Sequence, residues 1–168
     1  QVLDFSRPKK LNITCFALGD MISELVNLLK LERREKEIQF ELSLECSRQN
    51  IFADKDQIRQ ALMNIILNSI QAVPPGGVID ISLQLTTYQN EEALLISIKD
   101  NGAGISQEEL SHIFDPFFTT RSQGTGLGLS IAHNIIEMHQ GTIVVESEKG
   151  KGTEVKIFIP AGGSREIE

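Results

Sequence analysis

The sequence is 168 residues long, which suits one domain with a buried core. Apolar residues make up 40% and charged residues 23%, as in ordinary soluble proteins, and the formal net charge is −7. This acidic balance, without a visible basic patch, argues against a general nucleic-acid-binding module. We find no apolar run of the length that a membrane span needs and no signal peptide.

The first residues are expected to form a linker. The sequence opens with Gln1 rather than Met, which indicates either an excised part of a longer protein or a processed product, and Ser6-Arg7-Pro8 reads as the end of a helix. Apolar residues then recur at helical spacing over residues 17–34.

Cys15 and Cys46 are isolated, without CxxC spacing or nearby histidines. This favours buried free thiols in a reducing compartment over a disulfide.

One long helix is predicted between short strands and a proline-rich stop. Residues 38–44 alternate apolar and polar side chains, as a half-buried strand does, and residues 51–53 are a short strand candidate. Asp54 is predicted to cap a helix that runs to Val73, with Gln57 completing a capping box. The Pro-Pro-Gly-Gly run at 74–77 ends this helix.

The second half combines strands, one helix and a long polar loop. The predicted elements are, in chain order, strand 78–87, turn 88–92, strand 93–99, loop 101–126 with a short helix over 107–113, helix 126–139, strand 143–146, a Gly150-Lys151-Gly152 turn, strand 154–159 and a disordered tail over 161–168. Helices and strands mix without regular βαβ alternation. The sequence therefore predicts an α+β two-layer sandwich, with a mixed or antiparallel sheet of about five strands packed on about three helices.

The helix over 54–73 has an unusual polar face. Uncharged amides recur at steps of three and four residues and form one stripe, made of Gln57, Gln60, Asn64, Asn68 and Gln71. A solvated face usually carries Glu, Lys and Arg instead, and Asn is a mediocre helix former. Amide oxygens are suitable hard ligands for Mg²⁺ beside phosphates. The stripe alone leaves a solvated face and a metal site equally open.

The segment Asp100-Asn101-Gly102-Ala103-Gly104-Ile105 follows a predicted strand. Such a segment is often only a turn, and taken alone the turn is favoured. A carboxylate here is also able to accept a hydrogen bond from an exocyclic amine, while the glycines let the backbone approach a purine ring.

Three of the eight phenylalanines lie within five residues of the polar loop, in Phe114-Asp115-Pro116-Phe117-Phe118-Thr119-Thr120-Arg121. Either they pin the loop to the core or they form the hinge of a mobile lid. In the second case Thr119, Thr120 and Arg121 are available to phosphate.

Glycines alternate in Gly124-Thr125-Gly126-Leu127-Gly128-Leu129, which enters a predicted helix. Such backbone directs N–H groups at an anion, and the helix N-terminus adds its dipole. A Rossmann motif would need a preceding strand, which residues 117–123 do not provide. The absence of a following Gly-Lys-Ser/Thr excludes a Walker A loop.

Taken in order, these four segments resemble the N, G1, F and G2 boxes of the histidine-kinase branch of the Bergerat-fold (GHKL) ATPases. The resemblance covers residues 11–160, which would form the ATP-binding catalytic domain. Gly150-x-Gly152-Thr153 is similar to the closing signature of the family. Residues 3–8, Leu-Asp-Phe-Ser-Arg-Pro, are similar to the end of its dimerisation helix pair, so residues 1–10 would be a helix end and linker.

The resemblance implies ATP and Mg²⁺ as cofactors and assigns roles to matching positions. Asn68 would coordinate the metal, and Asn64 would lie beside the metal or the phosphates. Asp100 would accept a hydrogen bond from the adenine amine, with Thr153 supporting the base. A mobile lid over residues 106–124 would bring Arg121 near the terminal phosphate. The remaining implied cofactor-binding positions are Gln71, Gly102, Gly104, Ile105, Thr119, Thr120, Gly124, Thr125, Gly126, Leu127, Gly128 and Leu129.

Two positions depart from the family pattern. Many members carry Lys where Gln71 stands and an aromatic residue where Ala72 stands. This Gln-Ala pair and the short Thr-Thr-Arg-Ser-Gln lid end are closer to nitrogen-regulation and sporulation-type kinases. Phosphate neutralisation would then depend on Arg121 and the metal.

The position of Asn64 separates the branches of this superfamily. The gyrase, Hsp90 and mismatch-repair relatives have a Glu there that acts as general base for hydrolysis, and an amide cannot accept that proton. Transfer would then need a histidine on the dimerisation helices. His112, His133 and His139 lack the expected context, so we expect no phosphoacceptor and no self-phosphorylation in this chain.

The implied partners are the phosphoacceptor helices and a cognate response regulator, in a cytoplasmic and homodimeric kinase, without nucleic acid and without direct membrane contact by this domain. Whether the parent protein is membrane-anchored is left open. Two alternatives remain: an anti-sigma-type serine kinase, and an interaction module that binds nucleotide without transfer.

Overall fold

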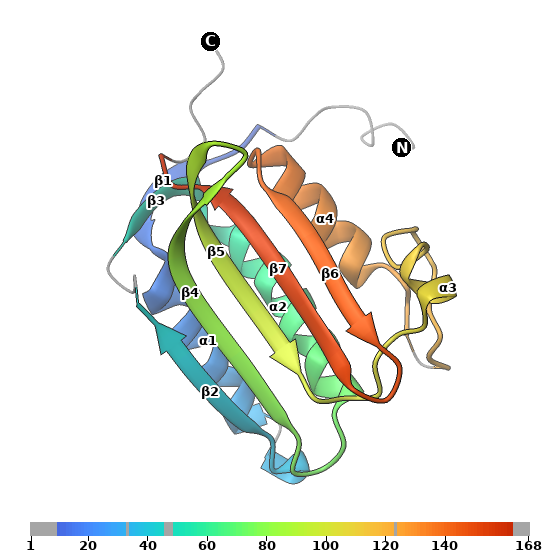
Figure 1. Cartoon of the computed structure of the whole chain (residues 1–168). Helices are drawn as coiled ribbons and strands as arrows, with labels where there is room; N and C mark the ends of the chain where they lie inside the picture. The colour runs from blue at the N-terminus through green and yellow to red at the C-terminus, as the bar shows by residue number, and fades with distance from the viewer. Residues whose placement is uncertain (1–9, 33, 46–48, 123, 163–168) are drawn as a thin grey trace, which may run out of the picture.

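The computed structural model describes residues 10–32, 34–45, 49–122 and 124–162 and has two layers (Figure 1). One layer is a five-stranded sheet in the order β2-β4-β5-β7-β6. Its strands are β2 (Gln39–Leu44), β4 (Val78–Tyr88), β5 (Glu91–Asp100), β7 (Gly152–Pro160) and β6 (Thr142–Glu148). The helices α1 (Leu18–Glu32), α2 (Lys55–Ala72) and α4 (Gly128–Met138) lie behind one face of this sheet (Figure 1). The predicted two-layer α+β sandwich is confirmed.

The sheet is mixed because one pair of strands is parallel. β2 runs parallel to β4, whereas β4–β5, β5–β7 and β6–β7 are antiparallel. β4 and β5 form a hairpin in which Gln89 and Asn90 have φ of 51° and 66°, the signature of a two-residue type I′ turn. The predicted turn over 88–92 is therefore too long, since pairing continues to Tyr88 and Glu91.

A second, two-stranded sheet was not predicted. β1 (Ile13–Ala17) pairs antiparallel with β3 (Asn50–Asp54). The side chain of Cys15 is exposed there, so the prediction of a buried thiol is wrong for this residue. The thiol of Cys15 is free; Cys46 lies outside the described residues.

The shorter elements also differ from the predictions. The helix predicted over 107–113 is the four-residue α3 (Gln107–Leu110), followed by turns, and a 3-10 turn η1 (Arg34–Lys36) precedes β2. None of the helices in the described part of the chain has both the length and the apolar character that a membrane crossing requires. The predictions for residues 1–9 and 163–168 lie outside the described residues.

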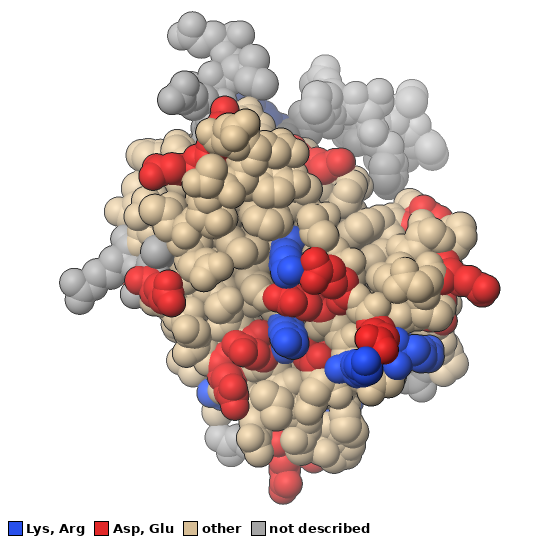
Figure 2. Space-filling view, in the orientation of Figure 1, with Lys and Arg blue, Asp and Glu red and all other residues tan. Residues whose placement is uncertain are grey.

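The open face of the sheet is polar, and the opposite face holds the core. Figure 2 shows acidic and basic side chains mixed on the open face. Lys156 and Glu146 form an ion pair at 2.9 Å between β7 and β6. On the other face, apolar side chains of the strands pack against the buried face of α2. That face consists of Ile58, Ala61, Leu62, Ile65, Ile66, Ser69 and Ile70.

The start of α2 is fixed from two sides. The carboxylate of Asp54 accepts hydrogen bonds from the backbone N–H of Gln57 and of Asn12, which confirms Asp54 as the cap. The predicted capping box is wrong, because the backbone N–H of Asp54 donates to Nε2 of His139 at 3.0 Å rather than to Gln57. Nδ1 of His139 lies 2.7 Å from the Ile135 carbonyl. These two contacts define the neutral Nδ1–H tautomer of a fully buried ring.

We predict that His139→Ala lowers the free energy of unfolding by about 3 kcal/mol, because it leaves a cavity and an unpaired Asp54 N–H. Urea unfolding followed by circular dichroism measures this. His112→Ala is the matched control, since the His112 side chain is exposed and should change stability by less than about 0.5 kcal/mol. Equal stability of the two variants would contradict the structural role of His139.

Candidate functional site

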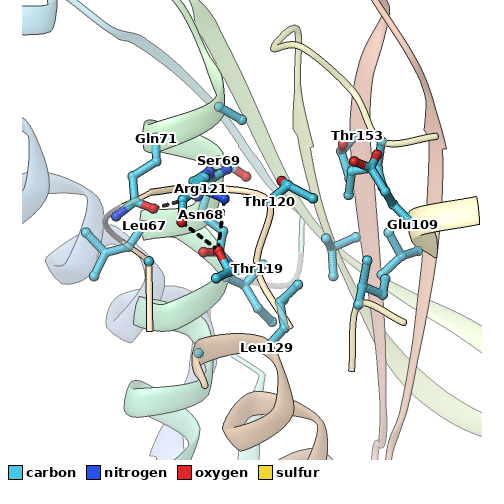
Figure 3. Close-up of a pocket in the computed structure, with 18 of the residues that line it drawn as sticks. Leu67, Asn68, Ser69, Gln71, Glu109, Thr119, Thr120, Arg121, Leu129 and Thr153 are labelled. Atoms are coloured by element: carbon cyan, nitrogen blue, oxygen red, sulfur yellow. Dashed lines mark hydrogen bonds between the residues drawn. The ribbon is translucent and has the colours of Figure 1, made fainter. Parts of the chain in front are cut away.

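One cavity of about 560 Å³ lies between α2, the loop after β5 and the start of α4. Figure 3 shows side chains from α2, the lid segment, α3 and β7 around it. All residues predicted as cofactor-binding line this cavity except Gly102 and Leu127. The lining residues among the predictions are Asn64, Asn68, Gln71, Asp100, Gly104, Ile105, Thr119, Thr120, Arg121, Gly124, Thr125, Gly126, Gly128, Leu129 and Thr153.

Asp100 is a buried carboxylate at the end of β5. Its Oδ1 accepts a hydrogen bond from the Gly102 N–H at 2.9 Å, and the Ser69 hydroxyl and the Thr153 N–H also donate to it. Burial raises the pKa of Asp100 above 3.8, while these three donors and the nearby Arg121 guanidinium oppose the rise. A carboxylate held in this way presents a fixed acceptor to the cavity.

The loop after Asp100 is held in place by close backbone packing. Gly104 has φ of +69°, and a Cβ there would lie 2.0 Å from the Glu148 carbonyl oxygen. The N–H of Ala103 donates to the Ala72 carbonyl at 3.3 Å, and the N–H of Gly150 donates to the Ala103 carbonyl at 2.7 Å. The loop therefore joins the end of α2 to the β6–β7 turn.

The amide stripe of α2 divides into two parts. Asn64, Asn68 and Gln71 line the cavity, whereas Gln57 and Gln60 do not. Nδ2 of Asn64 donates to the Gly128 carbonyl at 3.2 Å, which leaves its Oδ1 available. The cavity end of the stripe therefore combines oxygen donors with the start of α4.

The start of α4 has free backbone donors. Leu127 is the N-cap and makes no side-chain cap bond to the helix, although its own N–H approaches Oγ1 of Thr125 at 3.4 Å. Gly126 has φ of +69° and approaches the Phe117 backbone so closely that a Cβ would lie 2.4 Å from its carbonyl carbon. An uncapped N-terminus beside a cavity favours an anion such as phosphate.

The lid segment, residues 106–122 and 124, contacts α2 through Arg121. Its guanidinium donates to Oε1 of Gln71 and, at 3.2 Å, to the Asn68 carbonyl (Figure 3). Burial lowers the pKa of Arg121, and the nearby Asp100 carboxylate opposes this shift. The side chain remains a cation, and it contacts α2 while lying near the Asp100 carboxylate.

The three phenylalanines of this segment have different environments. Phe114 packs against the core and against the His133 ring, with ring centroids 4.6 Å apart and the two planes tilted by 35°. Phe118 lines the cavity, whereas Phe117 is 75% exposed with φ of 67°. Phe114 therefore pins the loop to the core, as one of the two interpretations predicts. The mobility of the lid stays a prediction.

Several contributing residues were missed by sequence reasoning. Ser69 donates to Asp100 but reads in the sequence as part of the packed face of α2. Glu109 and Lys149 both line the cavity, and their charged atoms lie 3.7 Å apart. They come from α3 and the β6–β7 turn, so no local motif indicates them.

The residues present fit magnesium better than a metal held by protein alone. The described residues contain no group of three His, Cys, Asp or Glu side chains suited to a metal. The amide oxygens of Asn68 and Asn64 are hard donors, and Mg²⁺ is typically held by few protein ligands together with substrate phosphates.

A buried acceptor, amide oxygens and an uncapped helix N-terminus around one cavity define a nucleotide-binding domain. Residues 53–163 match the family described as histidine kinase-, DNA gyrase B-, and HSP90-like ATPase. The chain belongs to this family, which implies ATP binding.

Relatives place the chain in the histidine-kinase branch. The nucleotide-free catalytic domain of histidine kinase ThkA superimposes with a TM-score of 0.80 at 34% identity, covering 90% of this chain and 97% of that one. Sensor histidine kinase ZraS of Escherichia coli (strain K12) is 36% identical over 98% of this chain and 35% of its own length. Sporulation kinase E of Bacillus subtilis (strain 168) is 36% identical over 83% of this chain and 19% of its own length. The chain thus spans about a third or less of these two relatives.

We predict that nucleotide affinity falls as pH is lowered from neutrality toward 3.8, because burial makes Asp100 protonate above that ordinary value. A protonated carboxyl no longer presents two acceptor oxygens. The stability of the free protein changes with pH in the opposite direction to nucleotide affinity. Because the pKa of Asp100 is raised in the folded state, the folded state binds this proton more tightly than the unfolded state. This contribution to stability is full below pH 3.8 and is lost as pH rises through the folded pKa.

Calorimetric titration with ATP over this pH range measures the effect. Asp100→Asn should bind ATP much more weakly at neutral pH and show a flatter pH profile. Protonation of ATP itself affects binding to both proteins equally, so it does not contribute to the difference between their pH profiles. Identical pH profiles would show that Asp100 does not face the base.

Proposed function

We propose that this chain binds Mg·ATP and donates the γ-phosphate to a histidine on dimerisation helices outside the sequence, in two-component signalling. The observation that supports this most is the convergence of Asp100, Asn68 and the start of α4 on one cavity. Their chemistry matches the three parts of the ligand, namely base, metal and phosphates. The proposed site residues are those named above, with Gly102 and Leu127 acting through the backbone.

The residues of this chain would act mainly by positioning. Asp100 would accept a hydrogen bond from the adenine amine, and backbone N–H groups at Gly128 and Leu129 would meet the phosphates. Asn68, beside Asn64, would hold Mg²⁺, which when bound neutralises phosphate charge in phosphoryl transfer. Arg121 would exchange its contacts with Gln71 and the Asn68 carbonyl for the terminal phosphate.

The partners are proposals because the relatives are longer than this chain. Histidine kinase ThkA has been solved in complex with response regulator protein TrrA, and that kinase is 32% identical to this chain with a TM-score of 0.74, covering 89% of this chain and 42% of that one. We propose a response regulator as partner here too, with a cytoplasmic, homodimeric parent kinase. Residues 1–10 would then join this domain to its dimerisation helices.

We predict that Asn68→Ala lowers affinity for Mg·ATP at least about tenfold and changes affinity for metal-free ATP much less. Alanine is the best helix former, so the change should not unfold α2. Calorimetry with ATP in Mg²⁺ and in EDTA measures both constants. Gln60→Ala, on the same helix but outside the cavity, is the control and should bind normally. An equal loss with and without metal would place the magnesium elsewhere.

We predict that the chain does not phosphorylate itself but phosphorylates a separately added dimerisation domain of its own parent kinase. Labelled ATP and acid-labile phosphohistidine detection measure both reactions. In the described residues the three histidines lie on the lid and on or just after α4, with His139 fully buried. Stable phosphohistidine on the isolated chain would refute the first part. Phosphoserine on an added protein substrate would favour the serine-kinase alternative, and binding without transfer would favour the interaction module.

A further inference from the structure

Ser147 connects three backbone segments beside the cavity without lining it. It lies on β6, and its hydroxyl oxygen is 2.8 Å from the Ile105 N–H nitrogen, 2.9 Å from the Gly152 carbonyl oxygen and 2.8 Å from Oγ1 of Thr153. Ile105 belongs to the loop after Asp100, while Gly152 and Thr153 begin β7. Sequence reasoning gave no role to Ser147, which lies just beyond the strand predicted over residues 143–146; in the structure β6 continues to Glu148.

Only one arrangement of protons satisfies all three contacts together. The Ile105 N–H is a donor, so Ser147 accepts from it. The Gly152 carbonyl is only an acceptor, so the single hydroxyl proton of Ser147 is donated there. Thr153 must then donate its own hydroxyl proton to the remaining lone pair of Ser147. Proton positions are fixed here by the partners, as for any hydroxyl network.

The hydroxyl oxygen of Thr153 can consequently act only as a hydrogen-bond acceptor toward a ligand in the cavity. It lies directly opposite Asp100 in the β5–β7 register, and its backbone N–H donates to that carboxylate. The cavity wall at this point therefore presents two neighbouring acceptors, the Asp100 carboxylate and the Thr153 hydroxyl oxygen. No hydroxyl proton is available to rotate toward a ligand.

Two adjacent acceptors discriminate between purines. Adenine carries an exocyclic amine, a donor, where guanine carries the O6 acceptor. The adenine amine can donate hydrogen bonds to these two acceptors. Guanine O6 would face only their lone pairs and would remain without a hydrogen-bond partner in a buried place. A site that leaves a buried polar group unpaired rejects that ligand more strongly than a site that merely fits it poorly.

We propose that Ser147 is a specificity-determining positioning residue, which keeps Thr153 an acceptor and thereby favours adenine over guanine nucleotides. This rests on the proposed function, since it requires the base to lie at Asp100. Ser147 touches no ligand itself and acts through Thr153.

The test is the ratio of dissociation constants for GTP and ATP, both with Mg²⁺, measured by calorimetry on the whole chain. Ser147→Ala frees the Thr153 proton to meet O6, so the ratio should fall about tenfold, the size expected for one hydrogen bond to a buried group. Ser147→Thr retains a hydroxyl and should restore the ratio. Ser97→Ala is the matched control, because it removes a strand hydroxyl bonded to Glu154 on the opposite face of the sheet.

Thr153→Val separates this mechanism from a general loosening of the loop. It removes the acceptor, so it should lower the ratio by itself, and adding Ser147→Ala should lower it no further. An unchanged ratio in folded Ser147→Ala, or additive effects in the double variant, would overturn the proposal. Should Ser147→Ala fail to fold, an unchanged ratio in Thr153→Val would overturn it equally. Failure of the unaltered chain to bind ATP would instead overturn the proposed function.

Discussion

The hydrogen bonds to the Asp100 carboxylate join the elements that form the site. Ser69 donates from α2, Gly102 from the following loop and Thr153 from β7. Burial disfavours an ionised carboxylate, which is why the pKa of Asp100 is raised despite three donors and the nearby Arg121. The donors needed to keep this charge in the fold also fix the position of helix, loop and strand around the cavity. Local stability and ligand geometry thus depend on the same contacts.

α2 connects the hydrophobic core to the cavity, and it is held at both of its ends. One face packs against the sheet, and the carboxylate of Asp54 caps its start. Its last turn has no basic residue of its own, but Nζ of Lys36 donates to the Ile70 and Val73 carbonyls at 2.9 and 3.2 Å. Arg121 adds a second cation at the Asn68 carbonyl. Both complement the negative end of the helix dipole, so the lid segment has a defined place on α2 in this structure.

The parts of the fold that sequence reasoning predicted are those with local signals. Periodicity located α2, α4 and most strands, and five strands were expected in the main sheet. β1 was missed because its burial does not alternate and its partner β3 is distant in the sequence. The hairpin turn was drawn too long because Gln89 and Asn90 lack the glycine that usually marks a type I′ turn. Cys15 was expected to be buried because free Cys usually is, but it lies on this unpredicted β1–β3 ribbon.

The residues of the candidate site divide in the same way, into those with a signal in the sequence and those without one. Asp100, Asn68 and most of the glycine loop line the cavity, and they were predicted because the four segments, taken in order, resemble those of a known family. Ser69 and Ser147 were not, because a serine gains its role only from the groups that meet it in space. Asn64 was singled out in the sequence because an amide cannot act as a general base. The structure adds a positive role for this side chain, a hydrogen bond to the start of α4.

Through its bond to the Gly128 carbonyl, Asn64 holds the start of α4 beside α2. A Glu at this position would repel that carbonyl unless it were protonated, since a carboxylate has no proton to donate. In this structure a donor at position 64 therefore joins the start of α4 to the amide-bearing side of α2. The same donor cannot remove a proton from water. The residue that makes this contact therefore cannot act as a general base, which agrees with the proposal that the phosphate is transferred to an external nucleophile.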